Sequence, residues 1–433
     1  MRYLPLNNTI LIVHRLSALM MSITLLMTGN SLFSTLVSLR ADAENYGAGM
    51  IGVMTSAYFL GFAITTLWVG GLINRVGHIR SFAVFASVST TISLIFLVII
   101  DPWIWVGLRF IMGMCVSGCF VVTESWLNNR ATNQNRGLLL SMYMIIIYLA
   151  ATAGQQMLRI GDPSQFTIFV LASIVLATAI VPVALTKATF PAPVRKPKIN
   201  LIRLTHISPT AVAGCLIGGI ITSSLWGLGP IHAKSLGFTV DQIAIFMSIF
   251  VVGGLVFQLP VGRLSDYYDR RKVLWCVTLA ALFPSVVLSF GPLITSGLTF
   301  ISISILGGLV ATIYPLSISY ANDYLEPDEI ISTSAGFVLI FGIGSGLGPI
   351  ACSALITFAG SYGLFALVTG SLTILTLYIS FRMRQRQWVP THEKEAFVAF
   401  PEQPAPTIIS DMDPRVGNQK NLDLEGNEIK KFG

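Results

Sequence analysis

The stretch Gly262-Arg263-Leu264-Ser265-Asp266-Tyr267-Tyr268-Asp269-Arg270-Arg271-Lys272 is a dense group of charges between two long apolar runs. A bilayer core has no water to solvate such a group, so we expect it to lie just outside the core. A degenerate copy stands earlier, at Gly70-Gly71-Leu72-Ile73-Asn74-Arg75-Val76-Gly77-His78-Ile79-Arg80. These second and first basic segments begin 192 residues apart, at residues 262 and 70. Their spacing predicts a tandem repeat of helical segments.

The composition is that of a membrane protein. The 433 residues are 54% hydrophobic and 11% charged, with a mean hydropathy of +0.75. A helix needs about 20 apolar residues to cross a bilayer, and the chain offers twelve such runs, six on each side of a basic linker. We therefore predict an all-α polytopic membrane protein with twelve transmembrane helices in two six-helix pseudo-repeats. The net charge of +7 does not indicate nucleic-acid binding, because the cations gather at one set of loops.

The predicted domains are an N-terminal half (1–187), a cytoplasmic basic linker (188–207), a C-terminal half (208–386) and a disordered cytoplasmic tail (387–433). Within them we expect helices over about 10–39, 48–68, 81–100, 103–130, from 136, 166–185, 209–231, 242–261, 273–290, 298–321, 332–355 and one that ends near 381. A break is expected at Gly227–Pro230. The five cysteines are interpreted as small apolar packing residues, namely Cys115, Cys119, Cys215, Cys276 and Cys352.

One expected helix carries a glycine series with two open interpretations. It packs small or helix-bending residues into eight positions, Gly342, Gly344, Gly346, Gly348 and Pro349. Glycines allow close approach of a neighbouring helix, whereas the proline permits bending. The series is either a crossing point between helices or a gating hinge.

The two basic segments resemble the loop between helices 2 and 3 of the major facilitator superfamily, whose pattern is roughly Gly-x-x-x-Asp-Arg-x-Gly-Arg-Arg. In the second segment the matching residues are Gly262, Asp266, Arg270 and Arg271, and Asp269 stands where glycine is usual. In the first segment Gly70, Arg75 and Gly77 match, but Asn74 replaces the aspartate. The resemblance covers about residues 10 to 386.

The resemblance implies that these segments hold helix ends together and that their ion pairs break when the cavity opens on that side. In the second half Asp266, Arg270 and Arg271 would form this latch. In the first half Arg75 would pair with Glu124, since Asn74 supplies no charge. The alternative is that these charges only set the topology.

A finer resemblance is to the bacterial YcaD-like branch of the superfamily. It rests on Glu124-Ser125-Trp126-Leu127-Asn128, followed by Arg136-Gly137 and Tyr143-Met144. Many drug antiporters of the superfamily carry a glycine-proline motif on helix 5, and Gly154-Gln155 departs from it. This departure lowers the expectation of a drug/proton antiporter.

Arg109 is the one cation with no place at a membrane interface. An arginine inside a membrane is costly, so it is a candidate functional residue; with Gly113 it also resembles the superfamily motif on helix 4. A lone cation would favour an anionic substrate, and the alternative is that Arg109 binds carbonyls of a neighbouring helix. The proposed cavity residues are Thr28, Ser31, Arg109, Tyr148, Gln155, Trp226, Gln258 and Tyr314.

The first two of these belong to a polar stripe on the first helix, Thr24, Thr28, Ser31 and Thr35. The stripe either faces a water-filled cavity or consists of small hydroxyls that bond within their own helix or pack against a neighbour.

Eighteen of the 27 Lys and Arg residues fall in one set of loops, whereas three fall in the opposite set. The positive-inside rule then predicts a bacterial inner (plasma) membrane protein with both termini in the cytoplasm. No enzyme motif, cofactor site or metal site is evident, so we predict a monomeric secondary transporter of a small molecule, working by alternating access. Two alternatives stay open: efflux of drugs, metabolites or siderophores, and a non-transporting receptor or scaffold. Coupling to a proton is also left open, because no carboxylate is clearly placed in mid-membrane.

Overall fold

In the computed structural model, residues 6–130, 136–186, 201–325 and 330–385 are described, and this part of the chain forms helices and no strand. The N-terminal half comprises α1 (Leu6–Ala43), α2 (Gly47–Val76), α3 (His78–Val98), α4 (Pro102–Arg130), α5 (Arg136–Met157), η1 (Leu158–Ile160), α6 (Phe166–Thr178) and α7 (Ile180–Ala184). The C-terminal half comprises α8 (Leu201–Ile207), α9 (Pro209–Ser235), α10 (Val240–Tyr267), α11 (Arg270–Ser289), η2 (Gly291–Leu293), α12 (Ser296–Asn322), α13 (Ile330–Ala359), η3 (Gly360–Tyr362) and α14 (Gly363–Met383).

Within the described residues, eleven segments are long and apolar enough to cross a membrane. The last of them, Thr333–Met383, contains both α13 and α14, while α6 and α7 together form one span. The span divides at Ala179 because Pro182 has no N–H to bond the carbonyl of Thr178. The described chain therefore holds twelve membrane-spanning helices, six in each half, and the predicted fold class is confirmed.

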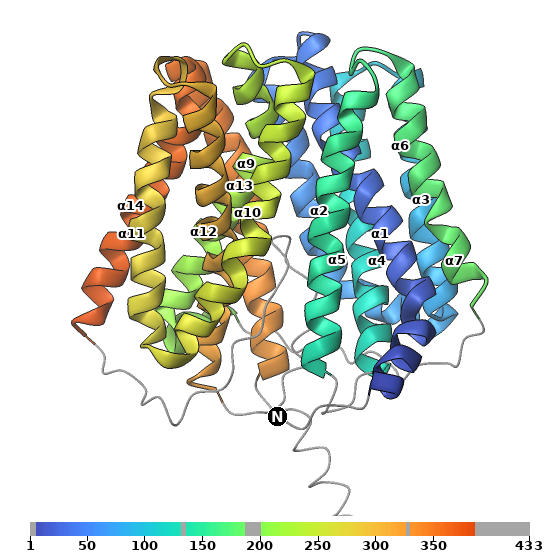
Figure 1. Cartoon of the computed structure of the whole chain (residues 1–433), viewed down its shortest axis with the longest axis horizontal. Helices are drawn as coiled ribbons and strands as arrows, with labels where there is room; N and C mark the ends of the chain where they lie inside the picture. The colour runs from blue at the N-terminus through green and yellow to red at the C-terminus, as the bar shows by residue number, and fades with distance from the viewer. Residues whose placement is uncertain (1–5, 131–135, 187–200, 326–329, 386–433) are drawn as a thin grey trace, which may run out of the picture.

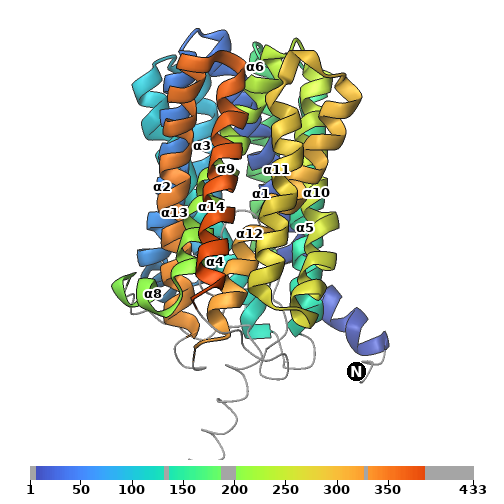
Figure 2. The same cartoon turned by 90° about the vertical axis from the view of Figure 1, so that its left-hand side faces the viewer.

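The helices stand roughly parallel, with the N-terminal half on one side and the C-terminal half on the other (Figures 1 and 2). Both basic segments lie at the end where α1 begins and α7 ends, which we call the linker end; the opposite end is the short-loop end (Figure 1). The halves meet where α2 packs against α13, α5 against α10 and α1 against α9. In Figure 1, α10 runs beside α5 at the short-loop end and diverges from it toward the linker end.

Glycines set the closest approaches between helices. A Cβ atom on Gly113 of α4 would lie 1.9 Å from the carbonyl oxygen of Tyr58 on α2, and one on Gly61 would lie 2.0 Å from that of Phe110. No side chain fits at such distances, so α2 and α4 touch through their backbones. Membrane helices gain their packing energy from such contacts, since lipid gives apolar side chains no separate drive to associate.

The glycine series of α13 is packed on two faces. Cβ atoms on Gly342 and Gly346 would meet Ala63 and Leu60 of α2 in the other half. Gly344 and Gly348 face α9 instead, where a Cβ on Gly344 would lie 2.1 Å from the carbonyl oxygen of Leu216. Because α13 continues through Pro349 to Ala359, the structure favours the crossing-point interpretation over the hinge.

The expected long loops at the basic segments are wrong. Helix α2 extends to Val76 and α3 begins at His78, so Gly77, with a φ of 89°, is the whole joint. In the second segment α10 ends at Tyr267, and the Asp269 carboxylate caps α11 by accepting from the Arg271 N–H at 3.0 Å. Charged residues end a bilayer span but do not end a helix, because the backbone bonds persist beyond the lipid.

Two smaller expectations need correction, and one is refined. Helix α9 runs unbroken from Pro209 to Ser235 with Pro230 inside it, so no break occurs at Gly227–Pro230. Part of the predicted linker is helical, since α8 covers Leu201–Ile207. Cys276 on α11 is exposed, while the other four cysteines are buried. The predicted tail, 387–433, lies outside the described residues.

Candidate functional site

Arg109 lies inside the N-terminal half, where α4 packs against α1 and α2. Its side chain is 2% exposed, and its guanidinium carbon is 4.5 Å from the centroid of the Tyr58 ring. Its Nη2 donates to the Ser34 hydroxyl at 3.3 Å, while Nη1 is buried and has no hydrogen-bond partner among the described residues. The Asn30 amide in turn donates to the Tyr58 hydroxyl at 3.2 Å. We call Asn30, Ser34, Tyr58 and Arg109 the arginine cluster.

No carboxylate belongs to the arginine cluster. The ion pairs found among the described residues do not include Arg109. The Tyr58 ring offers its electron-rich face to the guanidinium, which stabilises a cation without neutralising it. A charged, nearly buried group with an unused donor is therefore available to an anion.

The polar stripe of α1 lies in the contact with α5. The Thr28 hydroxyl donates to the Ala150 carbonyl at 3.2 Å, and the Ser31 hydroxyl donates to the Ala151 carbonyl at 2.8 Å. Gln155 accepts from the Thr35 hydroxyl at 2.8 Å and donates to the Ser31 hydroxyl at 2.8 Å. In this structure the stripe therefore joins two helices, which is the packing interpretation, and Thr24 bonds back to its own helix.

Four other predicted cavity residues are buried on four different helices, Tyr148 on α5, Trp226 on α9, Gln258 on α10 and Tyr314 on α12. The Trp226 ring packs edge-on against Phe250, with centroids 5.7 Å apart. The Tyr314 ring packs against Phe341 of α13 at 4.7 Å. All four are buried in the bundle, and their cavity role stays a prediction.

Glu124 is fully buried and does not pair with Arg75 in this structure, and the latch expected for the first half stays a prediction. Its Oε1 accepts from the Tyr143 hydroxyl at 3.0 Å, and its Oε2 has no partner among the described residues. Arg75 is exposed at the end of α2. Six residues of α4 follow Glu124, about 9 Å of helix, which is why a residue expected at a helix end lies within the bundle.

The second basic segment forms a buried ion-pair cluster within the C-terminal half. Arg270 Nη1 lies 2.5 Å from Asp323 Oδ1 and 2.8 Å from the Ser319 carbonyl oxygen. Its Nη2 lies 3.3 Å from Asp266, whereas Arg271 pairs with Asp269 at 3.0 Å. These bonds join α10, α11 and α12. Gly262 is buried on α10, and Gly70 and Asn74 lie on the linker-end part of α2.

Ion pairs between the halves occur at the short-loop end. Lys234 of α9 lies 2.5 Å from Asp42 of α1, and Arg159 of η1 lies 3.1 Å from Asp241 of α10. The Gln156 amide adds a bond of 2.7 Å to the Ser248 hydroxyl of α10. The N-terminal half supplies one acid and one base, and the C-terminal half supplies their opposites. We call the two ion pairs the short-loop clasp.

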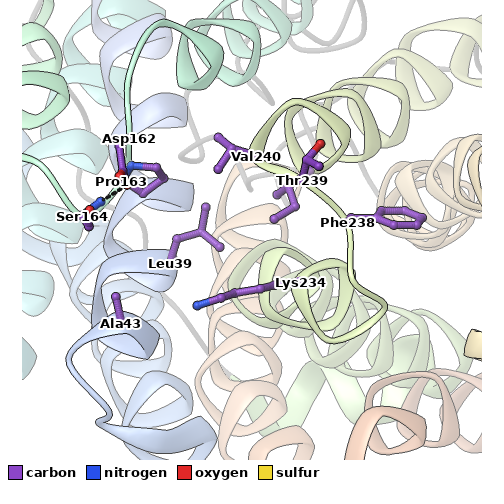
Figure 3. Close-up of a pocket in the computed structure, with 10 residues that line it drawn as sticks. Leu39, Ala43, Asp162, Pro163, Ser164, Lys234, Phe238, Thr239 and Val240 are labelled. Carbon is purple, nitrogen blue, oxygen red and sulfur yellow. Dashed lines mark hydrogen bonds between the residues drawn. The ribbon is translucent and has the colours of Figure 1, made fainter.

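A pocket of about 310 Å³ is lined by residues of both halves at this end of the molecule. Figure 3 shows Lys234 reaching from α9 toward α1, with Leu39 and Ala43 on the α1 side and Val240 on the other. The Ser164 N–H bonds Asp162 at 2.8 Å and holds the pKa of that carboxyl below its usual range. The pocket therefore has an acid and a base at its rim.

Reversing one charge of the short-loop clasp is expected to loosen this end. Lys234→Asp places two acids in contact. An exposed ion pair contributes about 0.2–1 kcal/mol, so the ratio of molecules closed to molecules open at the short-loop end should fall by up to roughly fivefold. Spin labels at Gly49 and Ser235 would report longer distances. The double exchange Asp42→Lys with Lys234→Asp should restore the wild-type distances. If the double variant resembles the single one, the clasp does not hold the halves together.

Comparison with known proteins supplies the family. A family model described as Major Facilitator Superfamily matches residues 19–231 and, a second time, residues 211–416. The chain belongs to the major facilitator superfamily. The double match corresponds to the repeat indicated by the two basic segments. As a member of this superfamily, the protein is a secondary transporter and not an enzyme.

Curated relatives of this superfamily member are bacterial. An uncharacterized MFS-type transporter of Yersinia pestis (strain Pestoides F) is 26% identical over 393 residues, which cover 89% of this chain and 100% of the relative. The uncharacterized MFS-type transporter YcaD of Escherichia fergusonii is 28% identical over 333 residues, which cover 76% of this chain and 86% of that protein. The resemblance to the YcaD-like branch is thus confirmed.

Solved structures share the fold of this superfamily member. The nucleoside transporter NupG superposes with a TM-score of 0.72 and 13% identity, covering 86% of this chain and 99% of that one. A D-xylose-proton symporter superposes with a TM-score of 0.68 and 14% identity, covering 88% and 98%. At this identity the likeness concerns the fold alone.

Several site residues of this superfamily member were missed from sequence. Asn30 could have been singled out, because a side-chain amide inside a membrane helix needs a partner. Tyr58 and Ser34 gave no such signal, since tyrosine and serine are common in membrane helices. The members of the short-loop clasp were visible as charges, but their partners lie on other helices. Asp42 and Lys234, for example, are 192 positions apart.

Proposed function

We propose that this transporter moves a small anionic molecule across the bacterial inner membrane by alternating access of its two halves. The observation that carries the proposal is the arginine cluster, in which Arg109 is buried without a carboxylate. A guanidinium binds a carboxylate or phosphate through paired, charge-assisted hydrogen bonds, and burial strengthens these bonds. The unpartnered Nη1 is the group that we assign to the substrate.

The conformation supports alternating access with the linker end open. The ion pairs described between the halves lie at the short-loop end, and α10 diverges from α5 toward the linker end (Figure 1). The distribution of Lys and Arg favours a cytoplasmic linker end and cytoplasmic termini. We accordingly interpret this conformation as inward-facing, with the short-loop clasp closing the periplasmic side.

The arginine cluster lies close below the clasp. Along α1, Ser34 is five residues from Leu39 of the pocket, about 7.5 Å deeper. An anion entering from the short-loop end would therefore pass Lys234 before it reaches Arg109. This order places two cations along one route, the outer one paired with Asp42 and the inner one without an acid.

The test is thermal stabilisation of the purified protein by carboxylates, sugars, amino acids, siderophores and lipophilic cations. A ligand that binds the folded state at 100 times its Kd stabilises it by about 2.7 kcal/mol. We expect an anion to stabilise the wild type and to bind Arg109→Gln roughly 10- to 100-fold more weakly, since a charged hydrogen bond contributes about 1.5–3 kcal/mol. Arg109→Lys should retain part of the affinity, because it keeps the charge but loses the planar donor pair.

Arg80→Gln is the matched control, because Arg80 is an exposed arginine at the start of α3. It should bind the anion like the wild type. Equal stabilisation of wild type and a folded Arg109→Gln variant would exclude the assigned role. Stabilisation by lipophilic cations alone would instead favour the efflux alternative.

A further inference from the structure

A second buried ionisable group lies on α4, nearer the linker end than the arginine cluster. Glu124 of α4 is 0% exposed, and the described ion pairs do not include it. Moving an ionised carboxylate from water into such a place is costly unless a cation neutralises it. A protonated Glu124 needs no such cation, because the proton on its carboxyl group cancels the charge.

The bonding around Glu124 fits one bound proton. The Tyr143 hydroxyl of α5 donates to Oε1 at 3.0 Å, so this oxygen acts as an acceptor in either charge state. Oε2 is buried without a partner among the described residues and is free to take a proton. Protonation at Oε2 therefore forms one O–H bond, breaks none in the protein and cancels one negative charge.

The ionisable side chains that the structure describes near Glu124 do not pair a cation with it. On α3, His78 bonds the Ser125 hydroxyl at 2.9 Å rather than Glu124, and on α2 the exposed Arg75 forms no pair with it. The described part of α1 between Ser17 and Ser31 carries no ionisable side chain. From the other half, the Tyr314 hydroxyl of α12 lies close enough for a Coulombic interaction with Glu124. Among the side chains that the structure describes, the ionisable neighbours of Glu124 are thus phenols and one imidazole.

We propose that Glu124, oriented by Tyr143, is the site at which this transporter binds a coupling proton. The inference deepens the proposed function. Its statement that proton binding is coupled to transport rests on that function, whereas proton binding itself does not. Arg109 and Glu124 are 15 residues apart on one helix, about 22 Å, so anion and proton bind at separate places. Proton binding at Glu124 removes a buried charge from the N-terminal half, and it biases the alternation to the extent that the two conformations bind the proton with different affinities.

The first experiment detects the proton without any substrate. Infrared difference spectra of the reconstituted full chain between high and low pH should contain the carbonyl stretch of a protonated carboxyl. Glu124→Gln should remove this band, and Tyr143→Phe should shift it, because the hydrogen bond to Oε1 is lost. Glu44→Gln, which alters the half-buried partner of Arg40 at the short-loop end, should leave it unchanged. The proposal would be overturned if the carbonyl band of the wild type were still present in the spectrum of Glu124→Gln.

The second experiment tests coupling in proteoliposomes, with the anion that stabilises the protein. A pH gradient should drive the wild type to accumulate the anion, whereas Glu124→Gln should only equilibrate it, a complete loss of accumulation. Accumulation by folded Glu124→Gln would contradict the coupling role. If no anion binds, the proposed function fails, yet the infrared band still decides whether Glu124 takes a proton.

A third measurement separates the proton from an organic cation. Tetraphenylphosphonium binding to the wild type, lost in Glu124→Gln and accompanied by no carboxyl band, would mean that Glu124 is a cation-substrate site and would overturn the proposal. Absence of such binding, together with the band, supports it.

Discussion

Replacing Gly113 by alanine is expected to lower the unfolding temperature of the purified transporter by several degrees. The new Cβ would lie 1.9 Å from the Tyr58 carbonyl oxygen, a backbone atom that cannot rotate away. Helices α2 and α4 must therefore separate along the seam where Gly61 also touches the Phe110 carbonyl. Overpacking of this kind costs typically 1–3 kcal/mol, and a contact with backbone lies at the upper end. Thermal unfolding followed by tryptophan fluorescence in detergent measures it.

The matched control is Gly107→Ala on the same helix. Gly107 is exposed, and a Cβ there would meet nothing within 4 Å. Alanine favours helix over glycine by about 1 kcal/mol, so this variant should unfold at the same temperature or a higher one. Equal destabilisation by both substitutions would show that α4 responds to helix propensity and not to the backbone contact with α2.

The same seam links the fold to the arginine cluster. Gly113 touches the backbone of Tyr58, and the ring of Tyr58 lies under Arg109, one helical turn from Gly113. A displaced α2 would withdraw the ring from the guanidinium. We therefore infer that the arginine–glycine spacing on α4 serves the site indirectly, because the glycine brings α2 close enough for its tyrosine to contact the cation.

Sequence patterns predicted the helices well because the bilayer imposes one simple rule. Each span needs a long apolar run, and the charged segments that separate the runs must lie outside the lipid. The pairing of Asp266 with Arg270 was also predictable in part, since the two residues are four positions apart and only a short turn separates α10 from α11. Local composition and local spacing carry both inferences.

The site was harder to predict because its partners come from distant helices. Arg109 was singled out because an arginine inside a membrane is costly. Its contact with Tyr58, however, depends on the close approach of α2 and α4. Glu124 was expected at a helix end as the partner of Arg75, and its burial follows from α4 continuing to Arg130 and from Tyr143 of α5 reaching it. Tertiary contacts of this kind produce no periodic pattern in the sequence of either helix that makes them.

Replacing Arg270 by glutamine is expected to destabilise the C-terminal half strongly. The substitution removes a buried cation, with 2% side-chain exposure, from the side of Asp323, whose side chain is 3% exposed. Breaking one partner of a buried ion pair costs about 3–5 kcal/mol, because the other charge is left desolvated. The double variant Arg270→Gln with Asp323→Asn should regain much of the loss, since no charge is stranded. Chemical or thermal unfolding of each variant provides the measurement.

Arg263→Gln is the control, because Arg263 belongs to the same basic segment but is exposed; its unfolding should match the wild type. The result also decides whether this ion-pair cluster is a latch that breaks during transport or a permanent contact that stabilises the C-terminal half. The bonds of Arg270 join α10, α11 and α12 of one half, so a rigid movement of that half need not break them. We therefore expect Arg270→Gln to lower stability whether the linker end is open or closed. A variant that unfolds like the wild type but shifts the distance between the halves would instead establish the latch.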